Sequence, residues 1–309
     1  YTTTIDGQNV HFYHVRSPHA EARPLLLSHG WPGSVVEFLE VLGPLSDPES
    51  HGGAPEDAFH VVAPSLPGYG FSGPTHERGY DVKRISETFA RLMGRLGYEE
   101  YFAQGGDWGA LITALLGANY PDRVTAIHTN MLFVRPSDLD DPVERLDEAG
   151  MADYRDTKQF REREVGYQEI QSTKPQTLAY GLTDSPSGLA GWIIEKFRTW
   201  SDCEDDVESS FTRDRLLDNI SVYWLTGTIN SSMRLYYETD PGAVIPERVD
   251  VPTGHARYPA EISKTPRQWA EEIYDIVYWN EMPEGGHFAA MEVPELFVED
   301  IRDYFGRFR

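Results

Sequence analysis

The sequence contains a single cysteine, Cys203, among its 309 residues. No intrachain disulfide can therefore form, and so low a cysteine content suits a reducing compartment, so we expect a cytoplasmic location. Long apolar runs are also missing: none approaches the roughly 18 residues that a membrane-spanning helix requires. No basic segment followed by an apolar signal region is present. We therefore expect no membrane insertion of this chain.

Positive charge is scarce. The chain has 27 Lys and Arg residues against 50 Asp and Glu residues, which gives a formal net charge of −23 and a sequence pI near 4.7. A surface this negative repels phosphate backbones and anionic lipid headgroups, which excludes nucleic acid and membrane surfaces as partners. Solubility is the ordinary interpretation of such a charge, and we favour it over a functional acidic patch.

Hydrophobic residues make up 40% of the chain, which is enough to bury a substantial core. The pair Asp6-Gly7 predicts a hairpin turn between two short strands in residues 2–15. Apolar runs then alternate with segments of helical period, which predicts an α/β fold with a mostly parallel sheet covered by helices on both faces. The expected further strands are 23–30, 59–68, 101–106, 123–133, 247–254 and 275–282. The expected helices are 81–97, 108–120, 265–274, 294–308 and one within 31–45 that has Ser34 as its N-cap.

The alternation is interrupted once. From residue 134 to residue 242 the chain has a high charge density and no buried-strand pattern, and its apolar residues recur at helical spacing. We therefore predict two parts: a core formed by residues 1–133 and 243–309, and an inserted, mainly helical cap formed by residues 134–242.

The stretch Gly105-Gly106-Asp107-Trp108-Gly109 has the frame G-x-D-x-G between a predicted strand and a predicted helix. This is the frame of the nucleophile elbow, with Asp in place of the usual Ser. The flanking glycines leave room for a close crossing of strand and helix, and the helix N-terminus favours an ionised carboxylate. The five residues alone leave two interpretations open for Asp107, a nucleophile or a simple N-cap.

The stretch His29-Gly30-Trp31-Pro32-Gly33 follows the first buried strand. In a fold with a nucleophile elbow, the turn after that strand supplies one backbone N–H of the oxyanion hole, and the residue after the nucleophile supplies the other. We therefore expect the backbone N–H groups of Trp31 and Trp108 to form this hole. A tight turn without catalytic function is the alternative for these five residues.

A base and its orienting acid are expected further along the chain, in the order nucleophile, acid, His. His287 lies on a Gly-Gly loop after the last predicted strand, where this order places the base. Position alone does not select the acid among 50 acidic residues. Glu261 is favoured because it lies on a loop after a predicted strand, whereas Asp250 lies within a strand and Asp275 begins one.

Taken together, these residues resemble the epoxide hydrolases of the α/β-hydrolase superfamily, in particular the microsomal-type branch. The resemblance covers nearly the whole chain, from RPLLLSHGWPGSVVEF through GGDWGA and IQSTKP to GGHFAAMEVPEL. It implies Asp107 as nucleophile, His287 as base and Glu261 as its acid.

The resemblance also implies two cap tyrosines that hold the epoxide oxygen, Tyr167 and Tyr236, with Tyr236 favoured over Tyr237. Helix packing is the alternative for these rings. One departure is that family members usually carry an N-terminal segment that wraps the cap, whereas this chain begins at the first core hairpin.

The expected activity is hydrolysis of a small-molecule epoxide to a vicinal diol through an alkyl ester on Asp107, without metal or organic cofactor. Because His287 must be neutral to activate water, we expect activity to fall at acid pH. The alternatives are a haloalkane dehalogenase, which uses the same Asp ester, and a non-catalytic binding protein on the same fold. The oligomeric state is open, a homodimer included.

Overall fold

A computed structural model of the chain describes residues 1–135 and 143–308. Its centre is an eight-stranded sheet in the order β1-β2-β4-β3-β5-β6-β7-β8. Strands β3 to β8 are mutually parallel, and only the two N-terminal strands are antiparallel to their neighbours. The predicted mostly parallel sheet is therefore confirmed. The strands are β1 (Thr2–Ile5), β2 (Gln8–Val15), β3 (Arg23–Ser28), β4 (Phe59–Pro64), β5 (Tyr101–Gly105), β6 (Val124–Thr129), β7 (Val249–Arg257) and β8 (Tyr274–Glu281).

The N-terminal hairpin turns at the predicted pair. Asp6 and Gly7 have φ values of +48° and +81°, the left-handed backbone that a two-residue hairpin loop of this kind requires. β1 and β2 pair antiparallel, with Ile5 opposite Gln8. β2 then joins the main sheet beside β4.

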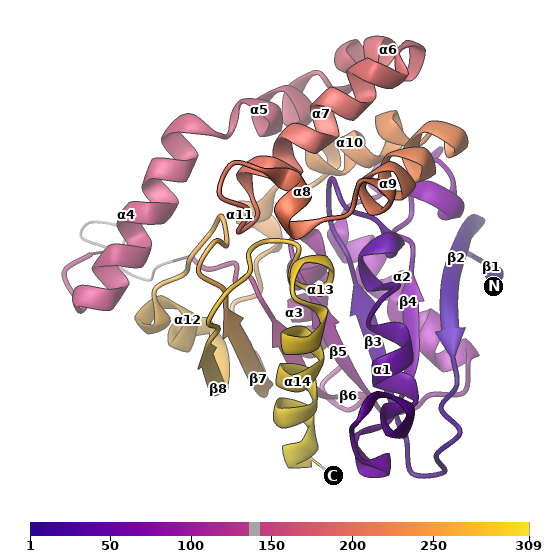
Figure 1. Cartoon of the computed structure of the whole chain (residues 1–309), viewed down its shortest axis with the longest axis vertical. Helices are drawn as coiled ribbons and strands as arrows, with labels where there is room; N and C mark the ends of the chain where they lie inside the picture. The colour runs from indigo at the N-terminus through magenta and orange to yellow at the C-terminus, as the bar shows by residue number, and fades with distance from the viewer. Residues whose placement is uncertain (136–142, 309) are drawn as a thin grey trace.

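The sheet is sandwiched between helices, which explains why its central strands are apolar along their whole length. On one face α2 and α3 bury side chains such as Phe89 and Leu111, and on the other α1 and α14 bury Leu45 and Ile301 (Figure 1). No helix in the described ranges is long and apolar enough to cross a membrane. The core helices are α1 (Leu42–Ser46), α2 (Val82–Arg95), α3 (Trp108–Asn119), α12 (Arg267–Ile273), α13 (Ala289–Glu292) and α14 (Pro294–Phe305).

Ser34 is an N-cap as expected, but the single helix expected after it, within residues 31–45, is wrong. The structure has a 3-10 turn, η1 (Val35–Phe38), capped by the side chain of Ser34, and then the short helix α1. Pro44 accounts for the interruption, because it has no N–H to donate to the carbonyl of residue 40 in a continuous helix.

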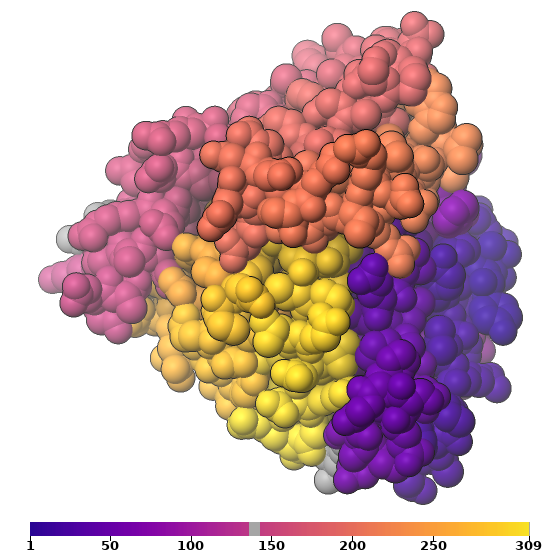
Figure 2. All heavy atoms as spheres, viewed as in Figure 1, coloured from indigo at the N-terminus to yellow at the C-terminus, as the bar shows by residue number. Residues whose placement is uncertain are grey.

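Between β6 and β7 the chain forms helices that lie across the carboxyl ends of the parallel strands (Figure 1). Figure 2 shows this segment seated on the core as a separate layer, with α4 extending beyond the core at one side. The predicted cap end at residue 242 falls inside α11, and residues 136–142 of the predicted cap lie outside the described residues. The helices here are α4 (Glu148–Arg163), α5 (Gly166–Thr173), α6 (Pro175–Asp184), α7 (Pro186–Thr199), α8 (Val207–Ser210), α9 (Arg213–Thr226), α10 (Ile229–Glu238) and α11 (Pro241–Val244).

Candidate active site

Asp107 occupies the turn from β5 into α3 with φ +50° and ψ −130°, a backbone conformation that non-glycine residues rarely adopt. Its side chain makes no capping hydrogen bond to the helix that follows. The start of α3 also lies so close to the end of β3 that a Cβ on Gly109 would lie 1.9 Å from the carbonyl oxygen of Ser28. The side-chain cap considered from the sequence is therefore absent, and the carboxylate is directed elsewhere.

The carboxylate of Asp107 lies against the loop after β3. Its Oδ1 accepts a hydrogen bond of 2.8 Å from the backbone N–H of Trp31. A Cβ on Gly30 would lie 2.1 Å from the same oxygen, so only glycine fits there. Among the described residues, the N–H of Trp108 makes no hydrogen bond to this carboxylate, although it lies next to Asp107 at the start of α3.

Buried groups fix this loop from both sides. The Nε2 of His29 accepts a 3.1 Å hydrogen bond from the N–H of Leu66, so its Nδ1–H donates to the carbonyl of Gly30 at 3.0 Å. Burial lowers the pKa of His29 to about 4, which keeps the ring neutral and this arrangement intact. From the cap, Asn219 donates to the carbonyl of Pro32. The Trp31 N–H is thereby held in place before any substrate binds.

His287 lies between two carboxylates. Its Nδ1 is 2.7 Å from Oε1 of Glu261, and its Nε2 is 3.3 Å from Oδ2 of Asp107. Glu261 is itself oriented, since its Oε1 also accepts a 2.7 Å bond from the N–H of Ile262. The structure therefore brings together the three side chains predicted as nucleophile, base and acid from three separate places in the sequence.

The two acids weighed against Glu261 in the sequence do not lie beside the base. Asp250 lies on β7 in an exposed ion pair with Arg248 at 3.1 Å, and Asp275 lies in β8. Neither contacts His287 in the described structure, whereas Glu261 is 5% exposed and hydrogen-bonded to it. The loop that follows β7, and not β7 itself, thus carries the acid that contacts the base.

Asn130 is a site residue that the sequence analysis missed. Its Nδ2 donates to Oε2 of Glu261 at 3.3 Å and contacts the carbonyl of His287 at 3.5 Å. Its Oδ1 accepts from Gln104 and lies against Gly106 of the elbow. A buried amide thus connects acid, base and elbow. The sequence analysis placed Asn130 inside the strand expected over 123–133, whereas β6 ends at Thr129. The available signal was this polar residue within an apolar run, near the sheet edge where the predicted nucleophile also lies.

Burial alone would lower the pKa of His287, but the adjacent carboxylates of Glu261 and Asp107 outweigh it and raise the pKa well above 6.5. In the free protein the imidazole is therefore protonated near neutral pH and bridges two negative charges. The sequence analysis considered only its neutral form.

Two tyrosines face the nucleophile from the cap, Tyr167 on α5 and Tyr236 on α10. The Tyr167 ring stacks on Trp31 with centroids 5.4 Å apart, and the Tyr236 ring meets Trp108 edge-on at 4.7 Å. Tyr237, the neighbour left open by the sequence, is 59% exposed, whereas Tyr236 is 5% exposed. Burial, with the Asp107 charge adding to it, raises the pKa of both inner tyrosines, so both stay protonated as donors.

Lys196 is a buried cation beside these rings. Its Nζ lies 5.0 Å from the ring centroid of Tyr167 and 5.8 Å from that of Trp200. Its carboxylate partner, Glu195 at 2.6 Å, is half exposed. The backbone carbonyl of Trp200 also accepts from the N–H of His287 at 2.9 Å, so the end of α7 contacts both the tyrosine and the base.

Glu37 is a further acid near the site that the sequence did not single out. Its carboxyl group occupies the space above Gly33, where a Cβ would lie 1.6 Å from Oε1. Burial raises the pKa of Glu37 to about 8, with the positive charge of His287 opposing and the negative charge of Asp107 adding. At neutral pH a protonated carboxylic acid therefore lies beside the loop that holds Asp107.

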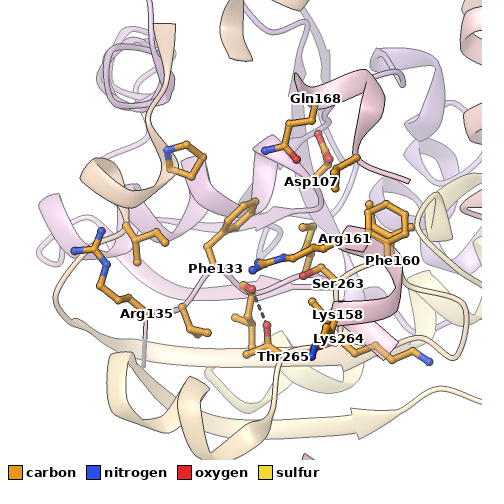
Figure 3. A pocket seen from close by; sticks show the side chains of 18 of the residues that line it. Asp107, Phe133, Arg135, Lys158, Phe160, Arg161, Gln168, Ser263, Lys264 and Thr265 are labelled. Atoms are coloured by element: carbon orange, nitrogen blue, oxygen red, sulfur yellow. Dashed lines mark hydrogen bonds between the residues drawn. The ribbon is translucent and has the colours of Figure 1, made fainter. Parts of the chain in front are cut away.

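Asp107, Tyr167 and Tyr236 open onto one cavity of about 890 Å³. Figure 3 shows Asp107 and Gln168 together, and the side chains that border the cavity below them. Its walls come from the segment after β6, from α4, α5, α10 and α11, and from the loop before α12. Within residues 1–135 and 143–308, no group of three or more His, Cys, Asp or Glu side chains is arranged to hold a metal ion.

Comparisons with known proteins agree with this geometry. Residues 23–182 match the family model for the α/β-hydrolase fold, and residues 1–38 match the model for the epoxide hydrolase N terminus. The chain is 40% identical to epoxide hydrolase 1 of Sus scrofa, with 99% of this chain and 74% of that protein covered.

Two solved structures are also similar. Juvenile hormone epoxide hydrolase from the silkworm Bombyx mori has a TM-score of 0.89 and 35% identity, with 100% of this chain and 78% of that chain covered. Aspergillus niger epoxide hydrolase has a TM-score of 0.87 and 32% identity, with 99% and 78% covered. Since such likeness extends over the entire core and cap, this chain belongs to the epoxide hydrolases of the α/β-hydrolase fold and hydrolyses epoxides to diols.

Proposed function

We propose that Asp107 opens the epoxide by direct attack and that His287 then directs water onto the resulting ester. The observation that carries this proposal is the position of the two carboxylate oxygens of Asp107. Oδ1 accepts from the Trp31 N–H, while Oδ2 faces His287 and the cavity. Oδ2 is therefore the attacking oxygen, and Oδ1 becomes the carbonyl oxygen of the ester, already in contact with an oxyanion donor.

The ring oxygen leaves as an alkoxide, and a phenol of Tyr167 or Tyr236 donates its proton to it. Both phenols are held protonated by burial and by the negative charge of Asp107. When Asp107 becomes a neutral ester, that charge is lost and both phenols become stronger acids. Attack by the nucleophile therefore promotes proton transfer to the alkoxide that the attack creates.

The same loss of charge affects His287. Two of the interactions that raise its pKa come from Asp107, and both weaken in the ester, while burial continues to favour the neutral ring. His287 then passes its proton to the tyrosinate, which restores the phenol. The neutral imidazole accepts a proton from water and returns it to the departing alcohol oxygen. Water oxygen enters the Asp107 carboxyl, and the proton that this carboxyl releases returns to His287 and restores the resting state.

This charge switch changes the pH dependence expected from the sequence. A protonated His287 is compatible with the alkylation step, because only ester hydrolysis needs the neutral ring. We therefore place the loss of activity at acid pH in the decay of the ester.

A one-turnover reaction in ¹⁸O-water with enzyme in excess tests the scheme. The expected result is ¹⁸O in a peptide that contains Asp107 and a largely unlabelled first-turnover diol. Label in the diol and none in the enzyme would mean direct attack by water and would overturn the ester scheme. Trapping of the alkyl-enzyme in His287→Gln, read as a mass increase equal to the epoxide, is the independent check.

The haloalkane dehalogenase and binding-protein alternatives have no support in the family comparison. The cytoplasmic location stays a prediction, supported by the single cysteine, Cys203.

A further inference from the structure

The loop that carries His287 has little stiffness of its own. Two consecutive glycines, Gly285 and Gly286, precede the base, and Gly285 has φ +98°. Glycine has more backbone conformations open to it than any other residue, so this segment does not hold a side chain in one place by itself. The position of the imidazole therefore depends on the contacts that fasten the loop.

Backbone contacts join this loop to the cap at the end of α7. The N–H of His287 donates to the carbonyl of Trp200 at 2.9 Å, and the N–H of Gly285 donates to Oδ2 of Asp202 at 3.1 Å. A Cβ on Gly286 would lie 2.8 Å from the carbonyl oxygen of Trp200, so this close approach requires glycine. The cap thus contacts the main chain of the base itself.

Glu292, the last residue of α13, completes this joint. Its Oε1 accepts a 2.8 Å hydrogen bond from the N–H of Phe288, next to the base, and its Oε2 accepts one of 2.8 Å from the N–H of Asp202 in the cap. Figure 1 shows α13 at the end of the core that faces the cap. One carboxylate therefore spans the base loop and the cap, although no step of the reaction uses it.

The charge of Glu292 changes near neutral pH. The side chain is half-buried, and burial raises its pKa to about 7, with the N–H groups of Asp202 and Phe288 opposing. Positive charge on His287 also favours the carboxylate, and the negative charge of Glu261 disfavours it. The other titratable groups that face it are Asp202, Cys203 and Tyr258. Because a carboxylate accepts hydrogen bonds more strongly than a carboxylic acid, the joint is tightest above about pH 7.

We propose that Glu292 is a positioning residue for His287, and that its carboxylate fixes the base loop to the cap during hydrolysis of the Asp107 ester. The inference rests on the proposed function, because it assumes that His287 acts as a base in that second step alone. A small displacement of a general base costs a large factor in rate. Loss of the joint therefore slows the decay of the ester and leaves its formation unchanged.

Glu292→Gln tests this proposal with little change in shape. An amide has one acceptor oxygen and an NH2 group that only donates, so it cannot accept from both N–H groups. In single-turnover experiments with styrene oxide, the alkyl-enzyme should form at the wild-type rate, and its hydrolysis should slow about tenfold at pH 8.5. The unchanged rate of alkylation also shows that the variant is folded.

The pH dependence separates a titrating joint from simple packing. At pH 6 the Glu292 side chain of the wild type is itself largely protonated, so most of its advantage over glutamine is already lost. With about one tenth of the wild type ionised, the tenfold difference should shrink to about twofold. Dividing the two hydrolysis rates at each pH cancels the effect of His287 protonation, which both proteins share.

The matched control is Glu295→Gln, which removes the same charge at an exposed position in the first turn of α14. Its rates of alkylation and hydrolysis should equal those of the wild type. In Glu292→Gln, a slower alkylation, an equal loss of hydrolysis at both pH values, or hydrolysis at the wild-type rate would each overturn the proposal. Absence of any alkyl-enzyme in the wild type would instead count against the ester on Asp107.

Discussion

The Nε2 of His287 lies 3.3 Å from Oδ2 of Asp107, close enough for base and nucleophile to share a proton in the resting enzyme. This contact couples the two steps of the reaction. While Asp107 is a carboxylate it supports the positive charge on His287, and once Asp107 is esterified that support disappears. Nucleophile and base are therefore not active at the same time.

The first prediction tests this coupling without substrate. In Asp107→Asn the negative charge of the carboxylate is lost. Burial then opposes protonation of His287, and Glu261 is the remaining carboxylate that favours it. The pKa of His287, followed by ¹⁵N-histidine NMR, should drop by about one unit or more. Asp250→Asn, an exposed carboxylate on β7, should leave that pKa unchanged. An equal pKa in wild type and Asp107→Asn would exclude the charge switch.

The second prediction concerns the cap tyrosines. Tyr167→Phe or Tyr236→Phe removes one hydrogen-bond donor to the alkoxide and should slow formation of the alkyl-enzyme about 100-fold in single-turnover experiments. Tyr237→Phe alters the adjacent, exposed ring and should have no effect. Alkylation at the wild-type rate in the Tyr167→Phe/Tyr236→Phe double variant would remove the tyrosines from the mechanism and favour a dehalogenase-like site.

A third prediction uses Glu37, the half-buried acid beside the oxyanion loop. The pKa of Glu37 is raised from 4.5 to about 8, so between these values the folded state holds a proton that the unfolded chain releases. The contribution of the Glu37 carboxyl group to the free energy of unfolding therefore falls as pH rises from about 4.5 to 8. Glu37→Gln should remove that loss and raise the melting temperature at pH 8.5 more than at pH 5.

Thermal unfolding measured at both pH values checks this prediction. Glu21→Gln, a change to an exposed glutamate, supplies the reference for the loss of one surface charge. An equal response of the two variants at both pH values would mean that Glu37 is ionised in the folded state.

The fourth prediction concerns Lys196, whose amino group lies 5.0 Å from the Tyr167 ring centroid. A cation over the ring stabilises negative charge that develops on the phenol as it donates its proton. Lys196→Met keeps the length of the side chain but loses the charge, and should slow alkylation about fivefold. Hydrolysis of the ester should be unaffected, which separates this effect from general misfolding.

Lys196→Arg should retain most of the alkylation rate, because it preserves the cation. Lys83→Met, at an exposed position on α2, serves as the control for removal of a lysine. Equal alkylation rates in wild type and Lys196→Met would leave this lysine with a packing role alone.

The sequence by itself determined the alternation of strands and helices, the interruption by a helical segment, and the turn at Asp107. These features depend on local rules: the period of apolar residues, the sites of glycine and proline, and chain order. The same rules predicted a single helix over residues 31–45, where Pro44 in fact limits the chain to two short turns. Local pattern also placed His287 on a loop after the last strand, where the structure has it.

Only the tertiary structure decided which polar groups meet. Glu261, and not Asp250, contacts the base because the loop after β7 turns back over the elbow. Tyr236 and Tyr237 are equivalent by composition, but the packing of α10 buries only one of them. Asn130, Glu37 and the protonated state of His287 depend on burial and on charges distant in the sequence. Such effects require the folded chain, because they arise from distances in space and not from spacing along the sequence.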